Sequence, residues 1–216
     1  MVVIGILIAL QVDTWREEQK SKNYERSILT EIRNSLLQGI PDSEAIRERA
    51  RSTREGAIRI AEYLNGSSLP EDSLHLLIER LRFRRIYNYN SGPYESLKSA
   101  GIEKISNDSL RFELIALYDD LFPAADQLIN EVLRERITDS EERYRGLFPP
   151  TGLDLDSQGN LEYRISLGEE TLQSPGFRQF VLEASVNGQL MEGMMTELIL
   201  RMEQLSALIE NELKPR

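Results

Sequence analysis

Hydrophobic positions along this chain recur mostly every three or four residues, which is the spacing of one face of a helix. The clearest case runs from about Pro175 to Leu213. Small or apolar residues alternate there as in a coiled-coil seam, at Val181, Ala184, Gly188, Met191, Met195, Leu198, Met202, Leu205 and Ile209. The pattern predicts a long C-terminal helix that packs against another helix. Its methionines are expected to fill irregular core space, with an adaptable partner-binding groove as the alternative.

The same spacing predicts helices in the first half of the chain. One carries Ile28, Ile32 and Leu36 and is expected to end near Gly39 and Pro41. Asp42 or Ser43 would cap a second helix, which Asn65 and Gly66 terminate. A third begins at Pro70 and Glu71 and ends in the basic run around Arg85; its buried face is expected to consist of Leu74, Leu77, Ile78 and Leu81.

The centre of the chain is predicted to be helical as well. Ser91 or Gly92 can cap a short helix that ends at Gly101, and Ser106 can cap the next one. That helix is expected to kink or break briefly at Pro123 and to continue toward Gly146. Its buried stripe is predicted at Leu110, Leu114, Leu117, Leu121, Leu128 and Val132, with Ile137 as a further candidate.

Residues 147–173 interrupt the helical pattern. The sequence FPPTG is a loop signal, and LDLDSQGNLEYRISL predicts two short strands around a turn. A calcium loop is the alternative, because Asp154, Asp156, Gln158 and Gly159 partly match the start of an EF-hand. Position twelve of that motif falls on Ile165 and not on the required glutamate, which favours a plain hairpin.

The first fifteen residues, MVVIGILIALQVDTW, are predicted to be the second half of a membrane anchor. From Val2 to Val12 the chain is apolar apart from Gly5 and Gln11, and as a helix this run covers about 17 Å of the roughly 30 Å of bilayer hydrocarbon. Trp15 lies where an interfacial aromatic residue is expected, with charged residues directly after it. A buried N-terminal helix of a soluble protein is the alternative. We therefore expect an anchor over residues 1–15, truncated or mis-started at Met1, continuous with one helical domain over residues 16–216.

Two segments resemble an uncharacterised bacterial family, a domain of unknown function. They are GILIALQVDTWREEQKSK near the N-terminus and YNYNSGPYESLKSAGIEKISNDSLR at residues 87–111. The resemblance implies a single-pass protein of the bacterial inner membrane with its bulk on the extracytoplasmic side, and it implies no chemistry. This chain departs from the family by lacking the basic tail and the first half of the span.

Composition excludes several classes of protein. The chain carries a formal net charge of −10, which opposes nucleic-acid binding, since that requires clustered cations. It has no cysteine, and therefore no thiol nucleophile, disulfide or thiolate metal site. His75 is the only histidine and is expected at the surface. Asp119 and Asp120, with Glu113 and Asp126 nearby, are expected to form a solvated acidic face and not a carboxylate site. We predict no cofactor and no metal, and without a catalytic set of residues an enzyme is only the third candidate, behind an interaction module and a ligand-sensing module.

One basic patch is a candidate for ligand or lipid head-group binding. It comprises Arg80, Arg82, Arg84 and Arg85, with Tyr87, Tyr89 and Tyr94 close behind in the sequence. Arg82, Arg85, Tyr87 and Tyr94 are the residues we single out. Ion pairing of the arginines with carboxylates, and tyrosines that bridge helices through their hydroxyls, are the alternatives. A looser set of arginines between Arg47 and Arg54 alternates with glutamates, and the same two interpretations, head-group binding or ion pairing, apply to it.

Taken together, these patterns predict an all-α, membrane-proximal antiparallel bundle with a long C-terminal helix and a small irregular or hairpin insertion near 150–173. The expected function is that of a membrane-anchored interaction or scaffold module, and the expected partners are the bilayer, a second copy or another membrane protein. A ligand-sensing helical module is the alternative.

Overall fold

The protein is all-α apart from one small hairpin. The computed structural model describes residues 2–82, 86–155 and 159–214. Its contacts divide the chain into two compact units. Unit 1 comprises residues 1–42, 88–124 and 198–216, and unit 2 comprises residues 43–87 and 125–197. The first and last long helices, α1 (Val2–Leu64) and α8 (Pro175–Leu213), each contribute residues to both units.

Helix α1 continues through Pro41 to Leu64, so the prediction of a helix end near Gly39 and Pro41 is wrong. Its most buried positions recur in steps of three and four on both sides of the proline, at Leu29, Ile32, Leu36, Ser43, Ile46, Ala50, Thr53, Ala57 and Ile60. Several of these residues are small or polar, so hydropathy alone hides the pattern. Packing along this face outweighs the one backbone hydrogen bond that Pro41 cannot donate. The predicted end at Asn65 and Gly66 is confirmed, with Gly66 at φ 102°.

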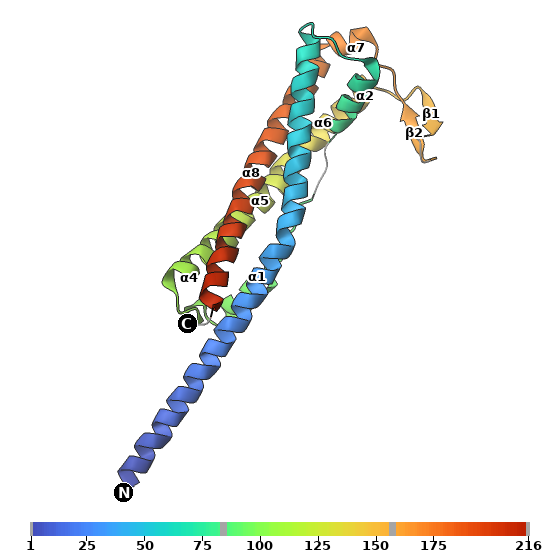
Figure 1. Ribbon diagram of the computed structural model, residues 1–216. Coiled ribbons are helices and arrows are strands. Elements are labelled where there is room, and N and C mark those ends of the chain that lie inside the picture. Colours follow the sequence, from blue (N-terminus) through green and yellow to red (C-terminus); the bar gives the residue numbers. More distant parts are fainter. Residues whose placement is uncertain (1, 83–85, 156–158, 215–216) are drawn as a thin grey trace. The chain divides into compact units, whose positions relative to one another are not determined.

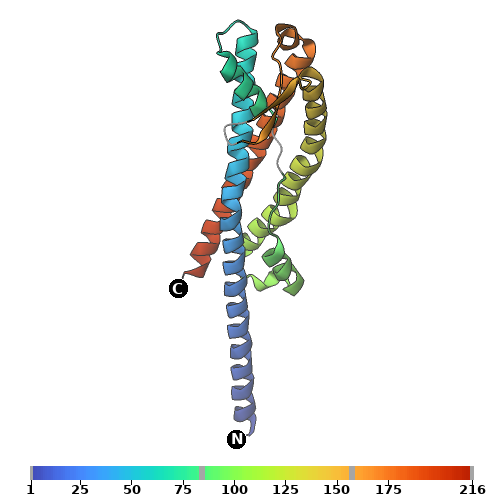
Figure 2. The same cartoon turned by 90° about the vertical axis from the view of Figure 1, so that its right-hand side faces the viewer.

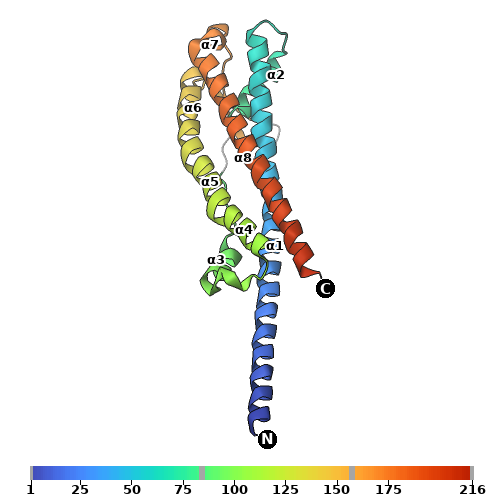
Figure 3. The ribbon, with the colours of Figure 1, turned by 90° about the vertical axis from the view of Figure 1, so that its left-hand side faces the viewer.

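Unit 1 is formed by the first part of α1, the end of α8 and the chain segment 88–124. That segment contains α3 (Gly92–Ala100), the 3-10 turn η1 (Ile102–Lys104), α4 (Asp108–Ile115) and the π-helical turn η2 (Ala116–Leu121). Asn107, and not Ser106, caps α4, because its side chain accepts a hydrogen bond from the Leu110 amide at 3.2 Å. Figure 3 shows α3 and α4 beside α1 in this unit.

Unit 2 contains α2 (Glu71–Arg80), α5 (Phe122–Asp126, shared with unit 1), the π-helical turn η3 (Gln127–Leu133), α6 (Arg134–Leu147), the hairpin and α7 (Glu169–Gln173). Strands β1 (Gly152–Leu155) and β2 (Leu161–Arg164) pair antiparallel, with Leu155 opposite Leu161. The predicted hairpin is confirmed, and it projects from the helices of unit 2 in Figure 1. Asp156 and Gln158 of the calcium alternative lie outside the described residues.

The long central helix is present, but its predicted buried stripe is partly wrong. Leu110, Leu114 and Leu117 are buried as expected, whereas Val132 is 41% exposed. After Pro123 the buried residues are Ala125, Ile129 and Leu133. A π-helical turn bonds residue i to i+5 and holds one residue more than an α turn, which changes the face that later residues occupy. Such turns lie at η2, directly before Pro123, and at η3.

The seam of α8 is confirmed in full, since every predicted position is buried. In unit 2, Gly188 lies so close to α1 that an added Cβ would meet the Ala50 carbonyl oxygen at 2.9 Å. In unit 1, a Cβ on Gly39 would meet the Met202 methyl group at 3.0 Å. Each unit therefore buries its part of α8 against α1, and a glycine permits the close approach of the two backbones in unit 2.

Candidate functional site

The first candidate site lies in unit 1, at the start of α1. The residues from Leu10 to Asn23 are almost entirely exposed, because no other element of unit 1 packs on them (Figure 2). Leu10 is 58% exposed, Val12 41% and Trp15 60%. We call residues 2–22 the N-terminal segment. Together with the apolar run that precedes them in the sequence, these residues make this helix end a candidate for contact with another surface.

Unit 1 closes around α1 directly after this segment. The Tyr24 hydroxyl lies 3.5 Å from the Ser96 carbonyl oxygen, and the Lys104 ammonium lies 4.9 Å from the centre of the Tyr24 ring. Glu25 accepts hydrogen bonds from the amide and the hydroxyl of Ser106 at 2.7 and 2.9 Å. Arg26 donates to the Leu213 carbonyl oxygen at 2.9 Å. One turn of α1 thus holds both η1 and the end of α8.

The second candidate site lies in unit 2 and centres on Arg82, directly after α2. Its guanidinium donates two hydrogen bonds to Glu141 on α6, at 2.9 and 3.4 Å. A third hydrogen bond reaches Glu79 at 2.8 Å. Tyr144 donates its hydroxyl proton to the other oxygen of Glu79 at 2.5 Å, and its ring lies 4.3 Å below the guanidinium carbon. The planar guanidinium can satisfy all these partners at once, which an ammonium could not.

Burial and hydrogen bonding change the proton affinities of this group of side chains. Partial burial alone would lower the pKa of Arg82, but the hydrogen bonds to Glu141 and Glu79 outweigh it and leave the pKa above the ordinary value. Burial raises the pKa of the Tyr144 hydroxyl, and its hydrogen bond to Glu79 raises it further. At neutral pH, therefore, Arg82 carries its charge and Tyr144 keeps its proton.

Two clefts of ligand size open beside this group, and Arg145 lines both. The first holds about 690 Å³ and combines His75, Glu79, Arg82 and Arg145 with apolar residues of the core and hairpin: Tyr144, Phe148, Pro150, Leu161 and Ile165. The second, of about 890 Å³, is lined by Ile86, Asn130, Arg134, Ile137, Thr138, Glu141, Glu142 and Arg145. In the first cleft two arginines face one carboxylate beside apolar walls, which suits a small organic anion with an apolar part, whereas in the second cleft two glutamates balance the two arginines.

Unit 1 contains a similar but smaller group of a tyrosine, a carboxylate and a cation. Tyr94 donates to one oxygen of Asp119 at 2.9 Å, and Lys98 donates to the other at 2.8 Å. Burial raises the pKa of Tyr94, and the hydrogen bond to Asp119 adds to the shift. The Tyr94 ring stacks on Tyr118 at 4.5 Å between centroids. Asp119 is therefore part of the packing of this unit and not simply one residue of a solvated acidic face.

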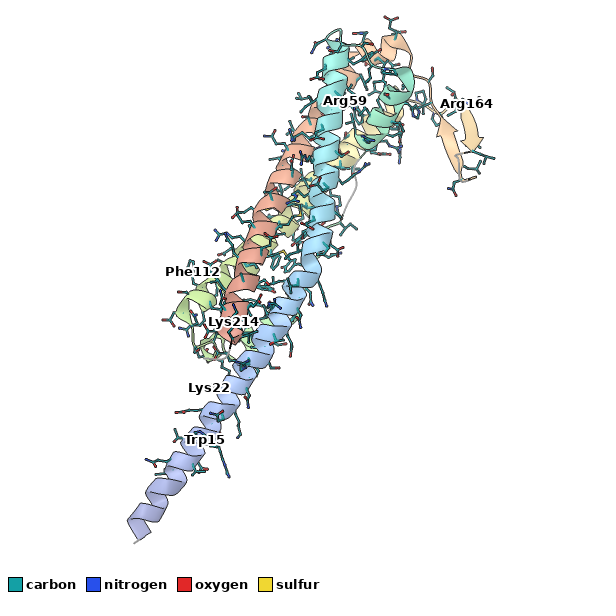
Figure 4. All side chains as sticks on the ribbon, in the orientation of Figure 1. Trp15, Lys22, Arg59, Phe112, Arg164 and Lys214 are labelled. Atoms are coloured by element: carbon teal, nitrogen blue, oxygen red, sulfur yellow. The ribbon has the colours of Figure 1, made fainter. Side chains whose placement is uncertain are left out.

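The structure places the sequence-predicted residues in different surroundings. Trp15 is exposed on the N-terminal segment in unit 1 (Figure 4). Tyr94 is buried in unit 1, whereas Arg82 and Tyr87 belong to unit 2. Tyr87 is 2% exposed, and the Asn130 side chain bonds both its amide and its carbonyl group. Arg85 lies outside the described residues. The buried rings of Tyr87 and Tyr94 offer no free face for stacking.

Sequence reasoning missed the partners of Arg82. Glu79, Glu141 and Tyr144 are scattered over more than sixty positions of the chain, and each resembles many other exposed residues of a polar helix. The spacing of Glu141, Tyr144 and Phe148 in steps of three and four was a usable signal that this stretch of α6 is buried. No pattern in the sequence indicated which carboxylate would meet which arginine.

Searches for known relationships add no further constraint. No protein-family model, curated protein or solved structure shows significant similarity to this chain. The resemblance to the uncharacterised bacterial family therefore stays a prediction. Among the described residues, no three His, Asp or Glu side chains gather closely enough to hold a metal ion. Within the same part of the chain, no helix has an apolar stretch long enough to cross a membrane.

Proposed function

We propose that this protein is an interaction module held at a lipid bilayer by its N-terminal segment. The observation that carries the proposal is the exposure of Leu10, Val12 and Trp15 on a helix whose preceding residues are apolar. The apolar run of about 17 Å would reach through roughly one leaflet of the hydrocarbon, which leaves Trp15 at the interface with the head groups. Following the resemblance, we propose a bacterial inner membrane with the bulk of the chain on its extracytoplasmic side.

Trp15 provides a direct test, because it is the only tryptophan of the chain. Mixed with lipid vesicles, the full chain should show a blue shift of its tryptophan emission, and lipids brominated near the head group should quench that emission. Both effects report the surroundings of Trp15 alone. Unchanged emission at saturating lipid would contradict the proposal.

Matched variants separate insertion from unspecific adhesion. Leu7→Asp with Leu10→Asp places two charges in the apolar run and should lower vesicle binding by more than tenfold, since a carboxylate is strongly disfavoured in hydrocarbon. Leu182→Asp with Leu190→Asp introduces the same charges on exposed positions of α8 in unit 2 and should leave binding unchanged. Equal losses in both variants would count against insertion through the N-terminal segment.

The interaction role rests on a second exposed apolar surface, in unit 2. Leu182, Val186 and Leu190 follow one another at steps of four on α8, and they are 63%, 40% and 42% exposed. Residues at this spacing share one face of a helix, as in helices that pair with a partner helix. Self-association at micromolar concentration, measured by sedimentation, should weaken in the variant with aspartates at 182 and 190. A monomer at every concentration would oppose self-association.

A ligand-sensing module is the second candidate function, and the clefts beside Arg145 favour it. Their volumes lie in the range typical of small-molecule sites. A panel of aliphatic and aromatic carboxylates should include members that raise the melting temperature of the full chain. Arg145→Gln should abolish this stabilisation, whereas Arg178→Gln, on an exposed turn of α8, should preserve it. A panel without any stabilising member would remove this candidate.

A further inference from the structure

The two kinds of basic residue are distributed unequally between the units. Every lysine of the chain belongs to unit 1, at positions 20, 22, 98, 104 and 214. The basic residues of unit 2 are all arginine, apart from its single histidine. A lysine ammonium is a strongly hydrated point charge on a flexible stem, whereas arginine suits fixed planar pairing. The lysines of unit 1 are therefore suited to contact with a hydrated partner whose charged groups are not fixed in position.

Three of these lysines, together with Arg26, surround one turn of α1. Lys22 is exposed at the end of the N-terminal segment, Lys104 lies over Tyr24, and Lys214 follows Leu213, whose carbonyl accepts the hydrogen bond from Arg26. We call Lys22, Arg26, Lys104 and Lys214 the cationic collar. Figure 4 shows Lys22 on α1, directly after Trp15 along the helix, and Lys214 at the end of α8 in the same unit.

Three carboxylates close to the collar have hydrogen-bond or ion-pair partners outside it. Glu25 accepts two hydrogen bonds from Ser106, and Glu212 accepts one from Asn107 at 2.7 Å. Asp108 pairs with Arg111. In the part of the chain that the structure describes, none of the four collar residues forms an ion pair with a carboxylate. Their charges therefore remain available to an external anion.

The collar also lies at a suitable depth. Lys22 is seven residues after Trp15, which corresponds to about 10 Å along a helix. With Trp15 at the edge of the hydrocarbon, Lys22 lies just outside the head-group layer, which is roughly 5 to 8 Å thick on each side. The distance from Trp15 is also comparable to the distance over which salt screens charges, about 8 to 10 Å.

We infer that the cationic collar binds the phosphate groups of anionic lipids, so that the protein prefers negatively charged bilayers. This inference rests on the proposed insertion of the N-terminal segment and adds the class of lipid. Each lysine near an anionic surface should raise the membrane partition coefficient about fivefold, and three lysines together should raise it on the order of a hundredfold. The lysine stems can follow lipid motion while their ammonium groups stay hydrated.

The test compares two kinds of vesicle through Trp15 fluorescence of the full chain. Phosphatidylcholine alone provides the neutral surface, and phosphatidylcholine mixed with phosphatidylglycerol provides the anionic one. The natural chain should bind the anionic vesicles on the order of a hundredfold more tightly. High salt should remove most of that preference, because it screens charges outside the hydrocarbon.

Two variants with the same change in net charge complete the test. Lys22→Gln, Lys104→Gln and Lys214→Gln together should lower the preference for anionic vesicles on the order of a hundredfold, leave only the contribution of Arg26, and keep the binding to neutral vesicles. The control, Arg59→Gln, Arg136→Gln and Arg178→Gln, removes three exposed charges from unit 2 and should retain the preference. Far-UV circular dichroism verifies that both variants fold.

The outcomes separate the two proposals. Equal binding of the natural chain to neutral and anionic vesicles overturns the collar inference and leaves insertion intact. The same holds if the control variant loses the preference as completely as the collar variant. A Trp15 emission that responds to neither vesicle overturns the proposed insertion itself.

Discussion

Each unit contains a triangle of a buried tyrosine, a carboxylate and a cation, and the two triangles differ in their cation. In unit 1 the triangle is Tyr94, Asp119 and Lys98; in unit 2 it is Tyr144, Glu79 and Arg82. The lysine makes one hydrogen bond to its triangle, and half of its side chain remains exposed. The arginine continues to a second carboxylate, Glu141, which is 8% exposed.

This difference shows how much each unit depends on its cation. Asp119 keeps the hydroxyl of Tyr94 and contact with solvent when Lys98 leaves. Glu141 is nearly buried and accepts two hydrogen bonds from Arg82, whereas Arg145 lies 3.7 Å away and is largely exposed. Losing a hydrogen-bonded cation costs more at a buried carboxylate than at a surface ion pair, which contributes little. The arginine is therefore expected to be structural and the lysine replaceable.

Removing the cation from each triangle should give the largest contrast. We expect Arg82→Met to lower the free energy of unfolding by about 2 kcal/mol, less than for a fully buried pair because Arg82 is one-third exposed. Lys98→Met should produce no measurable change. Urea unfolding followed by far-UV circular dichroism measures both. If both variants lost the same stability, the additional hydrogen bonds from Arg82 to Glu141 would not account for a difference between the triangles.

Two glycines of the interface between α1 and α8 extend the comparison. Gly188→Ala should destabilise unit 2 by about 1 to 2 kcal/mol, because the new methyl group would press on the Ala50 carbonyl oxygen and the Arg54 amide, which are backbone atoms. Gly39→Ala should be neutral or stabilising by up to about 1 kcal/mol, since the flexible end of Met202 can move and alanine favours the helix. Thermal unfolding of both variants decides the sign of each effect.

The tyrosines predict a smaller effect, on the pH dependence of stability. Burial raises the pKa of both Tyr94 and Tyr144 above the ordinary value near 10. The folded protein then binds the phenolic protons more tightly than the unfolded chain does. Stability should be fully present below about pH 10 and should decrease as the pH rises toward the folded-state pKa values.

Phenylalanine variants test this sign. In the variants Tyr94→Phe and Tyr144→Phe, the urea concentration at the midpoint of unfolding should decrease less steeply as the pH rises above about 10. Tyr63→Phe is a suitable control, because its half-buried ring belongs to neither triangle. An alkaline slope that neither triangle variant reduces would exclude these two hydroxyls as its source.

Much of the fold followed from periodicity, and the failures have local causes. The α8 seam was predictable because its apolar residues are large enough to dominate the pattern, whereas on the corresponding face of α1 the polar Ser43 and Thr53 interrupt the apolar spacing. Proline was a misleading signal in α1, where packing on both sides keeps the helix intact. In the central helix the predicted stripe left the buried face after Leu117, at the π-helical turn η2, and missed Ala125, Ile129 and Leu133.

The candidate sites were predictable to different degrees. Trp15 was identifiable because its position after an apolar run is a local feature of the sequence. Arg82 was singled out for its charge, but its partners come from α2 and α6 and depend on the packing of two helices. Pairings of this kind require the positions of side chains far apart in sequence, which composition and spacing do not determine.

The absence of lysine from unit 2 has a practical consequence for labelling the protein. Reagents that acylate primary amines can react with the five lysine positions and the N-terminal amine, and all of these belong to unit 1. A protease that cleaves only after lysine would leave residues 105–214 in one piece, including the hairpin and all of α8. Amine-reactive dyes and cross-linkers therefore label unit 1 and do not react with the side chains of unit 2.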